Sequence, residues 1–344
     1  MRINKSLIFL LLLPVIISAQ NAKIDSFYVA NWNMENLYDT QNDSLTNDEE
    51  FLPESNKNWT DDRLEQKLTN LVKVINYMNK GCGPDVLAME EIENIMVMKR
   101  LIYKMRDRDY VIVHRNSPDR RGIDVGLIYD RSVFTIDSVE AIHVELPTHS
   151  PTRDILHTIL IHKKTGKKVH FYVNHWPSRL GGEEKSNINR VETAFVLKRS
   201  LDSLKLAQKE NNVIILGDFN DEPDNESITG TLGAKDFDCG SSDGNSLLNL
   251  SYKKFAEGEG SYLYNGKYEM IDQIIISPNF VFGNNSGYEC GSFEIIKPQF
   301  IIYESGRRKG GAIPTYEGSK YIGGFSDHFP VGAKFKMKEK NEAQ

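Results

Sequence analysis

The 344-residue sequence predicts an α/β fold, in which layers of β-strands pack against helices. Short apolar runs bounded by polar or turn-forming residues recur along the chain, as buried strands do. Two longer segments instead carry apolar residues at three- and four-residue steps, which is the spacing of one helix face. The chain is 40% hydrophobic and 26% charged, a composition typical of a globular protein with a sizeable core.

The first helix is predicted from the cap-type residues Thr60 and Asp61 to Gly81, and the second over residues 188–206. We interpret their apolar stripes as core contacts and not as cofactor-binding surfaces. Residues 49–58 and the glycine-rich segment 239–260 are predicted to be surface loops. Strands are predicted at residues 27–37, 86–89, 110–114, 125–129, 155–161, 169–173, 213–216, 273–276 and 331–335.

The N-terminal residues are predicted to be an export signal. Arg2 and Lys5 precede an apolar run over residues 7–17, and the small residues Ser18 and Ala19 follow it. This order is typical of a secretory signal, and the run is shorter than the ~20 residues that a membrane-spanning helix needs. We therefore expect a signal peptide over residues 1–19, a single domain over residues 20–344 without stable membrane insertion, and export to the periplasm or extracellular space.

The cysteine count fits an exported chain only in part. Disulfides persist outside the cytoplasm, but Cys82, Cys239 and Cys290 are an odd number. At least one thiol is therefore unpaired or bonds another chain. Cys239 and Cys290 form a possible pair, and the sequence leaves this open.

The charge balance bears on the partner. The formal net charge is −6, so the chain lacks the broad positive field of most nucleic-acid-binding domains. This argues only weakly against a nuclease, because acidic residues of a metal site contribute to the total. Local basic clusters at residues 120–121 and 307–309 suit either phosphate contacts or solvated loops.

The most informative stretch is the apolar run 213–216, which leads directly into Gly217, Asp218, Phe219 and Asn220. Asp218 and Asn220 are two residues apart, so an extended backbone points both to one side. A carboxylate and an amide placed together can orient an attacking water beside a hydrated cation. Glycine, aspartate and asparagine also favour turns. The motif alone leaves these two interpretations level.

Polar residues follow other predicted strands in the same way. Asn33 lies in the polar last part of the strand over residues 27–37, Glu90 and Glu91 follow the strand over residues 86–89, and His175 follows the strand over residues 169–173. Asp272 opens the strand over residues 273–276, and Asp327 with His328 precedes the last strand. Turn, cap or core roles explain each of these residues singly, but not their shared position at the ends of apolar strands.

Together these residues resemble the endonuclease/exonuclease/phosphatase superfamily, which includes deoxyribonuclease I, apurinic endonucleases, bacterial sphingomyelinases and inositol polyphosphate 5-phosphatases. The resemblance spans about residues 27–335, and the phrase from Asn174 to Arg179 is similar to exported bacterial members. It implies a four-layer α/β sandwich. Two mainly antiparallel sheets would pack face to face, flanked by helices, with the active site where strand ends from both sheets meet.

The resemblance also implies roles. Glu91, with Asn33 and Asp327, would supply hard oxygen ligands for Mg²⁺ or Mn²⁺. His328 would act with Asp272 as a carboxylate–imidazole pair, serving either as general base or as cationic clamp on the phosphate. Asp218 and Asn220 would orient the water, and His175 would hold a phosphate oxygen or donate a proton toward the leaving group.

Two departures from the family pattern leave assignments open. The family usually has Gln before its metal-binding Glu, whereas this chain has Glu90 before Glu91. Strand alternation would turn Glu90 away from the site, and a register slip of one would exchange the two. The carboxylate that supports the first histidine in deoxyribonuclease I has no clear counterpart here. Asp124 is the nearest candidate, and we list it with Arg179 as a substrate contact.

Three functions remain in competition. The first is an exported metal-dependent phosphodiester hydrolase, an endonuclease on DNA or RNA, acting as a monomer. The second keeps the site but acts on a phospholipid head group or another small phosphate ester. For a membrane-directed enzyme, the aromatic stretch Tyr262-Leu263-Tyr264 is a weak candidate contact. The third is a non-catalytic binding module, which the intact set of polar residues disfavours.

Overall fold

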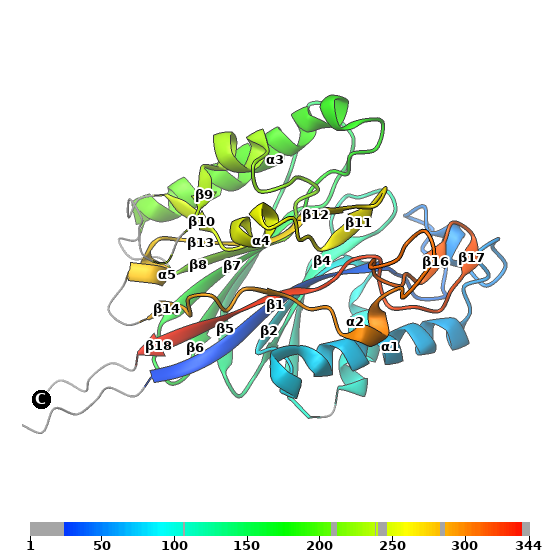
Figure 1. Cartoon of the computed structure of the whole chain (residues 1–344), viewed down its shortest axis with the longest axis horizontal. Helices are drawn as coiled ribbons and strands as arrows, with labels where there is room; N and C mark the ends of the chain where they lie inside the picture. The colour runs from blue at the N-terminus through cyan, green and yellow to red at the C-terminus, as the bar shows by residue number, and fades with distance from the viewer. Residues whose placement is uncertain are drawn as a thin grey trace, which may run out of the picture.

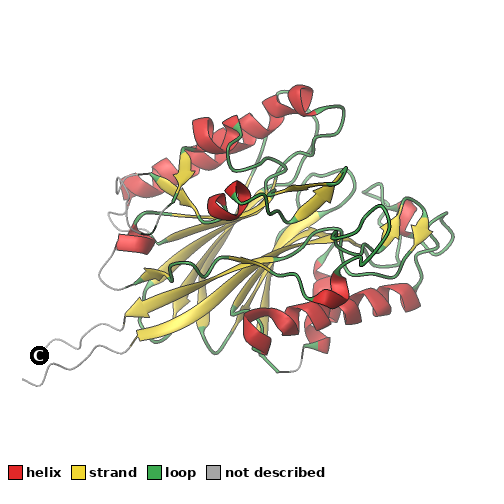
Figure 2. Ribbon diagram, in the orientation of Figure 1, coloured by secondary structure: helices red, strands yellow, loops and turns green. Residues whose placement is uncertain are grey.

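The computed structural model describes residues 24–338, except 106, 208–211, 238, 240–245 and 283–285. Two large sheets lie face to face, and helices cover their outer faces (Figure 1, Figure 2). This confirms the expected α/β sandwich of four layers with two mainly antiparallel sheets. The predicted signal peptide, residues 1–19, lies outside the described residues. Among the described helices, none combines the length and apolar content needed to cross a bilayer.

The first sheet has seven strands in the order β14-β18-β1-β2-β4-β3, and β15 also pairs with β18. Only β1 and β2 run parallel; the other pairs are antiparallel. The N-terminal strand β1 pairs with the C-terminal strand β18 from Ile24↔Lys338 to Asn31↔Val331. The strands are β1 (Ile24–Leu37), β2 (Val86–Ile92), β3 (Tyr110–His114), β4 (Asp124–Asp130), β14 (Gly287–Tyr288), β15 (Glu294–Ile295) and β18 (Val331–Lys338).

The second sheet also has seven strands, in the order β5-β6-β7-β8-β13-β10-β9. The pairs β7·β8 and β9·β10 are parallel, and the others are antiparallel. Two hairpins stand apart, formed by β11 (Tyr262–Tyr264) with β12 (Lys267–Glu269) and by β16 (Tyr316–Glu317) with β17 (Lys320–Tyr321). The sheet strands are β5 (Phe134–Ile142), β6 (Ile155–His162), β7 (Lys168–His175), β8 (Val213–Asp218), β9 (Ala234–Asp236), β10 (Leu247–Asn249) and β13 (Asp272–Ile276).

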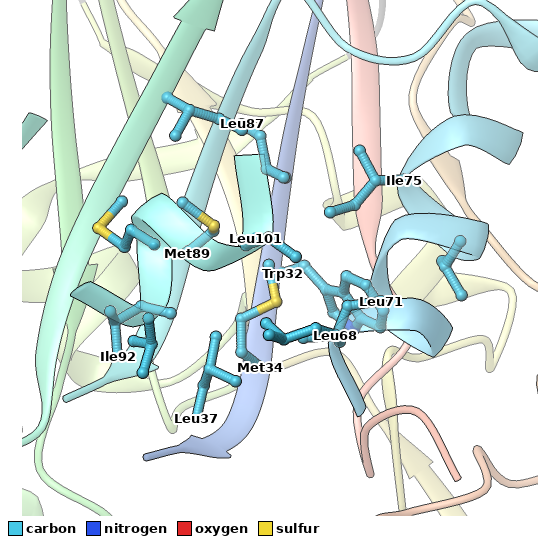
Figure 3. Packing of buried hydrophobic residues seen from close by; sticks show 14 of the residues in the cluster. Trp32, Met34, Leu37, Leu68, Leu71, Ile75, Leu87, Met89, Ile92 and Leu101 are labelled. Atoms are coloured by element: carbon cyan, nitrogen blue, oxygen red, sulfur yellow. The ribbon is translucent and has the colours of Figure 1, made fainter. Parts of the chain in front are cut away.

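Helices close the two outer faces of the sandwich. The helices α1 (Asp61–Gly81) and α2 (Ile95–Lys104) pack on the first sheet, and α3 (Glu183–Ala207) packs on the second. Figure 3 shows Trp32 and Met34 of β1 against Leu68 and Leu71 of α1. Shorter helices are α4 (Tyr252–Ala256), α5 (Asn279–Phe282), the 3₁₀ turns Glu49–Phe51 and Gln299–Ile301, and the π-helix Ser227–Leu232.

A large apolar layer lies between the sheets and follows from strand alternation. In β1, Phe27 and Val29 point toward the second sheet, whereas Tyr28 and Ala30 point toward the helices. Both rows are apolar, because both faces of the strand are covered. The inner row meets residues of β7, β8 and β13, so the two sheets share one core.

The structure departs from the sequence prediction in several elements. The second predicted helix begins earlier, at Glu183, and α2 and β5 were not predicted. Asn94 caps α2, since its Oδ1 accepts from the backbone N–H groups of Met96 and Val97. The segment 239–260 is not wholly a surface loop, because it contains the buried strand β10. Three consecutive residues are too few for a periodic signal.

Candidate active site

Polar side chains continue the inward-facing rows of several strands at one end of the core. In β8, Ile214 and Leu216 point between the sheets, so Asp218, two residues further, points the same way. Each sheet contributes to this row. Its other members are Asn33 of β1, Glu90 of β2, His175 of β7 and Asp272 of β13.

A hydrogen bond joins the two sheets within this cluster. The Nδ2 of Asn33 donates to Oδ2 of Asp218 at 3.1 Å, and both residues are buried. The Oδ1 of Asn33 accepts from the backbone N–H of Glu35 at 2.9 Å and keeps a second lone pair. Asn33 therefore orients Asp218 and still has an oxygen that faces the site.

His328 and Asp272 form the expected pair. The Nδ1 of His328 lies 2.7 Å from Oδ2 of Asp272. The hydroxyl of Ser261 donates to the same carboxylate at 2.6 Å. Burial alone would lower the pKa of His328, but the carboxylates of Asp272, Asp327 and Asp218 raise it well above its ordinary value. His328 is therefore an imidazolium at neutral pH, held in orientation by a fully buried carboxylate.

Asp218 is the second titratable group of the cluster. Burial raises its pKa to about 7, although the charge of His328 opposes this. Its Oδ1 accepts from the backbone N–H of Asn220 at 2.9 Å. Asn220 has a φ of 51°, a left-handed conformation that asparagine tolerates. This bend turns the Asn220 side chain so that Nδ2 donates to the carbonyl of Trp176 at 3.0 Å.

His175 stands between the carboxylates of both sheets. Its Nε2 lies 3.7 Å from Oδ2 of Asp218 and 3.9 Å from Oε1 of Glu91. Burial and the nearby Arg153 and Arg121 lower the pKa of His175 well below its ordinary value. Its Nδ1 is buried and has no hydrogen-bond partner among the described residues. His175 is therefore a neutral imidazole with one nitrogen directed into the site.

Glu91 enters the cluster through an irregularity in β2. Its φ is 59°, and the register of β2 against β4 shifts between Glu90 and Ile92. The backbone N–H of Asn36 donates to Oε2 of Glu91 at 2.7 Å. Burial raises the pKa of Asp327; the charge of His328 opposes this shift, and the carboxylate of Glu91 adds to it. A β-bulge thus turns a side chain into the site that regular alternation would turn out of it.

The expectation that Glu90 faces away from the site is wrong. Glu90 shares the inward face of β2 with Ala88, and its carboxylate accepts from Nδ2 of Asn31 at 3.3 Å. Burial raises the pKa of Glu90 well above its ordinary value, and Asp272 and Asp218 raise it further. Because the bulge at Glu91 interrupts the alternation, both consecutive glutamates lie on the inner side, Glu90 deep in the core.

The carboxylates and amide present suit a hard divalent cation. Glu91 of β2 and Asp327 of the segment before β18 offer carboxylate oxygens, and Asn33 of β1 offers an amide oxygen. Mg²⁺ characteristically uses one or two carboxylates and fills its other positions with water and substrate phosphate. Among the described residues, no three His, Cys, Asp or Glu side chains form a closed metal cluster. The donor set thus fits an open Mg²⁺ or Mn²⁺ site rather than a structural zinc site.

A buried lysine lies close to this acidic region. Lys67 of α1 is 1% exposed, and its ammonium donates to the backbone oxygen of Glu35 at 2.7 Å and to Thr315. The carboxylate of Glu35 lies 3.8 Å from this ammonium and accepts from the backbone N–H groups of Thr315 and Tyr316. Burial lowers the pKa of Lys67, whereas the carboxylates of Glu35, Asp327 and Glu91 act in the opposite direction and favour its charged form.

Two predicted residues occupy different positions from those expected. Asp124 is buried and pairs with Nε2 of His114 at 3.0 Å, so it does not support His175. Arg179 donates through Nε to the carbonyl of Asn220 at 2.7 Å, and its Nη1 lies 3.4 Å from Glu269. Arg179 therefore holds the Asn220 turn in place.

Sequence reasoning missed the residue that holds the His175 backbone. Arg153 is buried and donates to the carbonyls of His175 and Trp176 at 3.2 and 2.7 Å, while its Nη1 pairs with Asp119 at 3.0 Å. Ser261 was also missed. A lone arginine and a lone serine in unpatterned segments carry no periodic signal.

The sandwich with this polar cluster between its sheets is the architecture of a class of phosphoric ester hydrolases. The chain belongs to the endonuclease/exonuclease/phosphatase family, whose family model matches residues 28–337. No curated protein sequence matches the chain. The family assignment therefore rests on the family model, and the solved structures below agree with it in fold.

Several solved structures share the fold at low sequence identity. An endonuclease/exonuclease/phosphatase family protein from Bacteroides thetaiotaomicron has a TM-score of 0.57 at 18% identity, covering 94% of this chain and 99% of that one. A mannosyl-6-phosphatase from the same organism has a TM-score of 0.55 at 17% identity, covering 90% and 99%. TDP2 from D. rerio, complexed with a single-strand DNA product, has a TM-score of 0.55 at 15% identity, covering 90% and 98%.

Proposed function

We propose that the chain is a divalent-metal-dependent phosphodiester hydrolase whose substrate is a nucleic acid. The observation that carries this proposal is the convergence of Asn33, Asp218, Asp272 and His328 from both sheets. It combines an imidazolium, a carboxylate whose pKa is about 7, and an oriented amide within one buried cluster. Phosphodiester hydrolysis needs a positive clamp on the phosphoryl oxygens and a group that accepts a proton from water.

The metal ligands proposed are Glu91, Asp327 and Asn33. When bound there, Mg²⁺ or Mn²⁺ supplies Lewis-acid polarisation of a phosphoryl oxygen and charge neutralisation. The β-bulge at Glu91 supports this proposal, because it turns that side chain toward the inner side of the sheet. Hard oxygen donors favour these cations over softer metals.

The protein side chains divide the remaining work. His328, kept protonated by Asp272, clamps a phosphoryl oxygen that gains charge as the bond to water forms. Asp218 is poised to accept a proton from that water near neutral pH, and Asn33 and Asn220 hold its two oxygens in orientation. His175, kept neutral, donates a hydrogen bond through Nε2 toward the leaving oxygen.

A second candidate is a phosphatase or phosphodiesterase on a small phosphate ester or phospholipid head group. The fold similarity to a mannosyl-6-phosphatase supports this alternative, and the similarity to TDP2 with a DNA product supports a nucleic acid. The acidic net charge of −6 does not exclude a nucleic-acid substrate, because several of the acidic residues belong to the site.

We further propose that the protein is a monomer of one domain over residues 20–344, exported by the signal over residues 1–19. A basic, then apolar, then small-residue N-terminus supports export. The disulfide between Cys239 and Cys290, whose Cα atoms are 6.0 Å apart, also supports it. Cys82 is a free thiol.

A substrate panel tests the function. The mature protein is incubated with plasmid DNA, RNA, sphingomyelin and mannose 6-phosphate, each with Mg²⁺, Mn²⁺ or a chelator. We expect metal-dependent cleavage of DNA or RNA, abolished in Asp218→Ala and His328→Ala, with Asp137→Ala as a surface control. Turnover of only mannose 6-phosphate or sphingomyelin would establish the alternative, and turnover that survives chelation would refute the metal-dependent mechanism.

A further inference from the structure

A pocket of 480 Å³ lies beside the cluster and is not used by the chemistry described above. Two segments distant in sequence form it. One is the hairpin of β11 and β12, and the other is the loop that carries Arg307 and Arg308. The phenol of Tyr268 donates to the carbonyl of Gly310 at 2.7 Å, which ties the two segments together. The residues lining the pocket are Tyr262, Leu263, Tyr264, Asn265, Gly266, Arg307 and Arg308.

The hairpin contacts His328 through both its backbone and a ring. Tyr262 forms an antiparallel backbone bridge with His328, and the two rings lie 4.7 Å apart between centroids. The ring of Tyr264 lies 6.4 Å beyond that of Tyr262 at an interplanar angle of 14°. Asn265 and Gly266 both have positive φ, as a tight two-residue hairpin turn requires. The turn therefore presents Tyr264 at a fixed position one ring beyond the site.

The two walls of the pocket differ in chemistry. Tyr264 is 55% exposed although its ring stacks with Tyr262. Opposite it, Arg308 lies 3.3 Å from the carboxylate of Glu317. Among the described residues, none forms an ion pair with Arg307, which is exposed. The ring of Tyr264 can stack on an aromatic ring, and the unpaired guanidinium of Arg307 can bind an anion. Together, next to the proposed site, they suit a ligand in which a ring is joined to an anionic group.

We propose that this pocket binds the nucleotide adjacent to the scissile phosphate of a polynucleotide, with its base on Tyr264 and its phosphate on Arg307. This inference rests on the proposed nuclease function and specifies how the substrate is held. A phosphate monoester has its single phosphate at His328 and leaves Arg307 without an anion. A polynucleotide brings a second phosphate and a second ring along the same strand.

The structure disfavours a membrane-contacting role for the same hairpin. Leu263 packs closely on Gly311, where even an added Cβ would approach its side chain to 2.9 Å. Tyr262 is covered by His328, so Tyr264 is the single largely exposed ring among the lining residues. One aromatic ring in a concave pocket, next to arginines, suits a flexible strand better than a bilayer surface.

The test compares Tyr264→Ala and Arg307→Ala with two controls, Tyr103→Ala on α2 and Arg131→Ala in the turn after β4. Steady-state kinetics are measured on a fluorescent single-stranded oligonucleotide and on bis(p-nitrophenyl) phosphate, which lacks a neighbouring nucleotide. Fluorescence anisotropy with the oligonucleotide, in the presence of chelator, measures binding without turnover. Circular dichroism confirms that each variant is folded.

We expect Tyr264→Ala to raise the KM and Kd for the oligonucleotide roughly tenfold, because base–aromatic stacking contributes that much. Arg307→Ala should weaken binding and reduce the slope of log Kd against log salt by about one phosphate contact. In both variants, the preference for the oligonucleotide over the small diester decreases, and the controls keep it.

Two failures are distinguishable. If the wild-type protein cleaves the oligonucleotide but both pocket variants match the controls, this inference is overturned and the nuclease function stands. If the wild-type protein hydrolyses the small diester but neither binds nor cleaves the oligonucleotide, the nuclease function and the pocket assignment are both overturned.

Discussion

Asp218 and Asp272 stand directly opposite each other on the antiparallel strands β8 and β13. Directly opposed side chains of an antiparallel pair lie on one face, so two like charges here repel. His328, bonded to Asp272 at 2.7 Å, supplies positive charge beside both carboxylates. The carboxylates of Asp218 and Asp272 therefore repel each other, and protonation of Asp218 or a bound cation would reduce that repulsion.

Removing one of these charges should stabilise the metal-free protein. Burial raises the folded-state pKa of Asp218 from 3.8 to about 7. The folded state thus retains a proton that the unfolded chain releases, so stability decreases as pH rises from about 4 to about 7. We expect Asp218→Asn to gain about 0.5–2 kcal/mol at about pH 8 and to show a weaker pH dependence. Urea unfolding with chelator at about pH 5 and 8 measures both.

Asp137→Asn is the matched control for this experiment. Asp137 pairs with Lys168 on the surface at 2.7 Å, and such exposed pairs contribute about 0–1 kcal/mol. It should not stabilise the protein at either pH. An Asp218→Asn protein less stable than wild type at pH 8 would contradict the account of Asp218 as a repelled carboxylate.

Disrupting the Asp272–His328 pair should impair catalysis more than folding. Asp272→Asn removes the charge that keeps His328 protonated and oriented. We expect kcat to decrease about 10²–10⁴-fold, the range for a positioned acid–base group. The protonated form of His328 is lost as pH rises through its raised pKa, so the alkaline limb of the kcat/KM profile should move to lower pH.

The chain contains a matched control for this substitution. Asp124 forms a second buried Asp–His pair, with His114 at 3.0 Å, outside the cluster. Asp124→Asn should leave the pH profile unchanged. Equal loss of activity in Asp124→Asn and Asp272→Asn would show that a general structural effect, and not the catalytic pair, accounts for the result.

The two consecutive glutamates should differ in metal binding. Glu91→Gln removes a proposed ligand, and we expect Mg²⁺ or Mn²⁺ affinity to decrease at least about tenfold, as losses around metal sites do. Glu90→Gln should change affinity far less, because burial and its neighbours favour the neutral acid at that position. Titration calorimetry with Mn²⁺ measures both. The reverse order of effects would assign the ligand to Glu90.

Arg153 should contribute mainly to stability. Arg153→Met leaves Asp119 and the carbonyls of His175 and Trp176 without their buried partner. Breaking a buried pair on one side costs about 3–5 kcal/mol. Arg131→Met, which breaks the exposed pair with Asp109 at 3.5 Å, should cost at most about 1 kcal/mol. Thermal unfolding compares the two, and similar losses would argue against the proposed role of Arg153.

Much of the architecture was predictable because each strand has a simple period. Residues at alternate positions of β8 and β13 point into one core, and the polar residue that ends the inward row must point there too. Asp218 and Asp272 could thus be placed from the sequence. The helix α2 could not, because Ile95-Met96-Val97-Met98 resembles a short buried strand as much as a helix.

The details of the site were less predictable, for a physical reason. The bulge at Glu91 places a glutamate at positive φ, which nothing in the residue type signals. Lys67, Arg153 and Ser261 act through partners that are far away in sequence or are backbone atoms. Such contacts arise from tertiary packing, and a single sequence contains no local pattern that specifies them.

The pairing of β1 with β18 makes the ends of this fold depend on each other. Among the described residues, the antiparallel partner of residues 24–31 is residues 331–338, and Asp327 and His328 lie just before that last strand. A chain interrupted earlier during synthesis would lack both groups and would leave β1 as an open edge able to join other chains. Asp327, His328 and the strand that covers the edge of β1 thus come from one short segment, so a single truncation would remove all three.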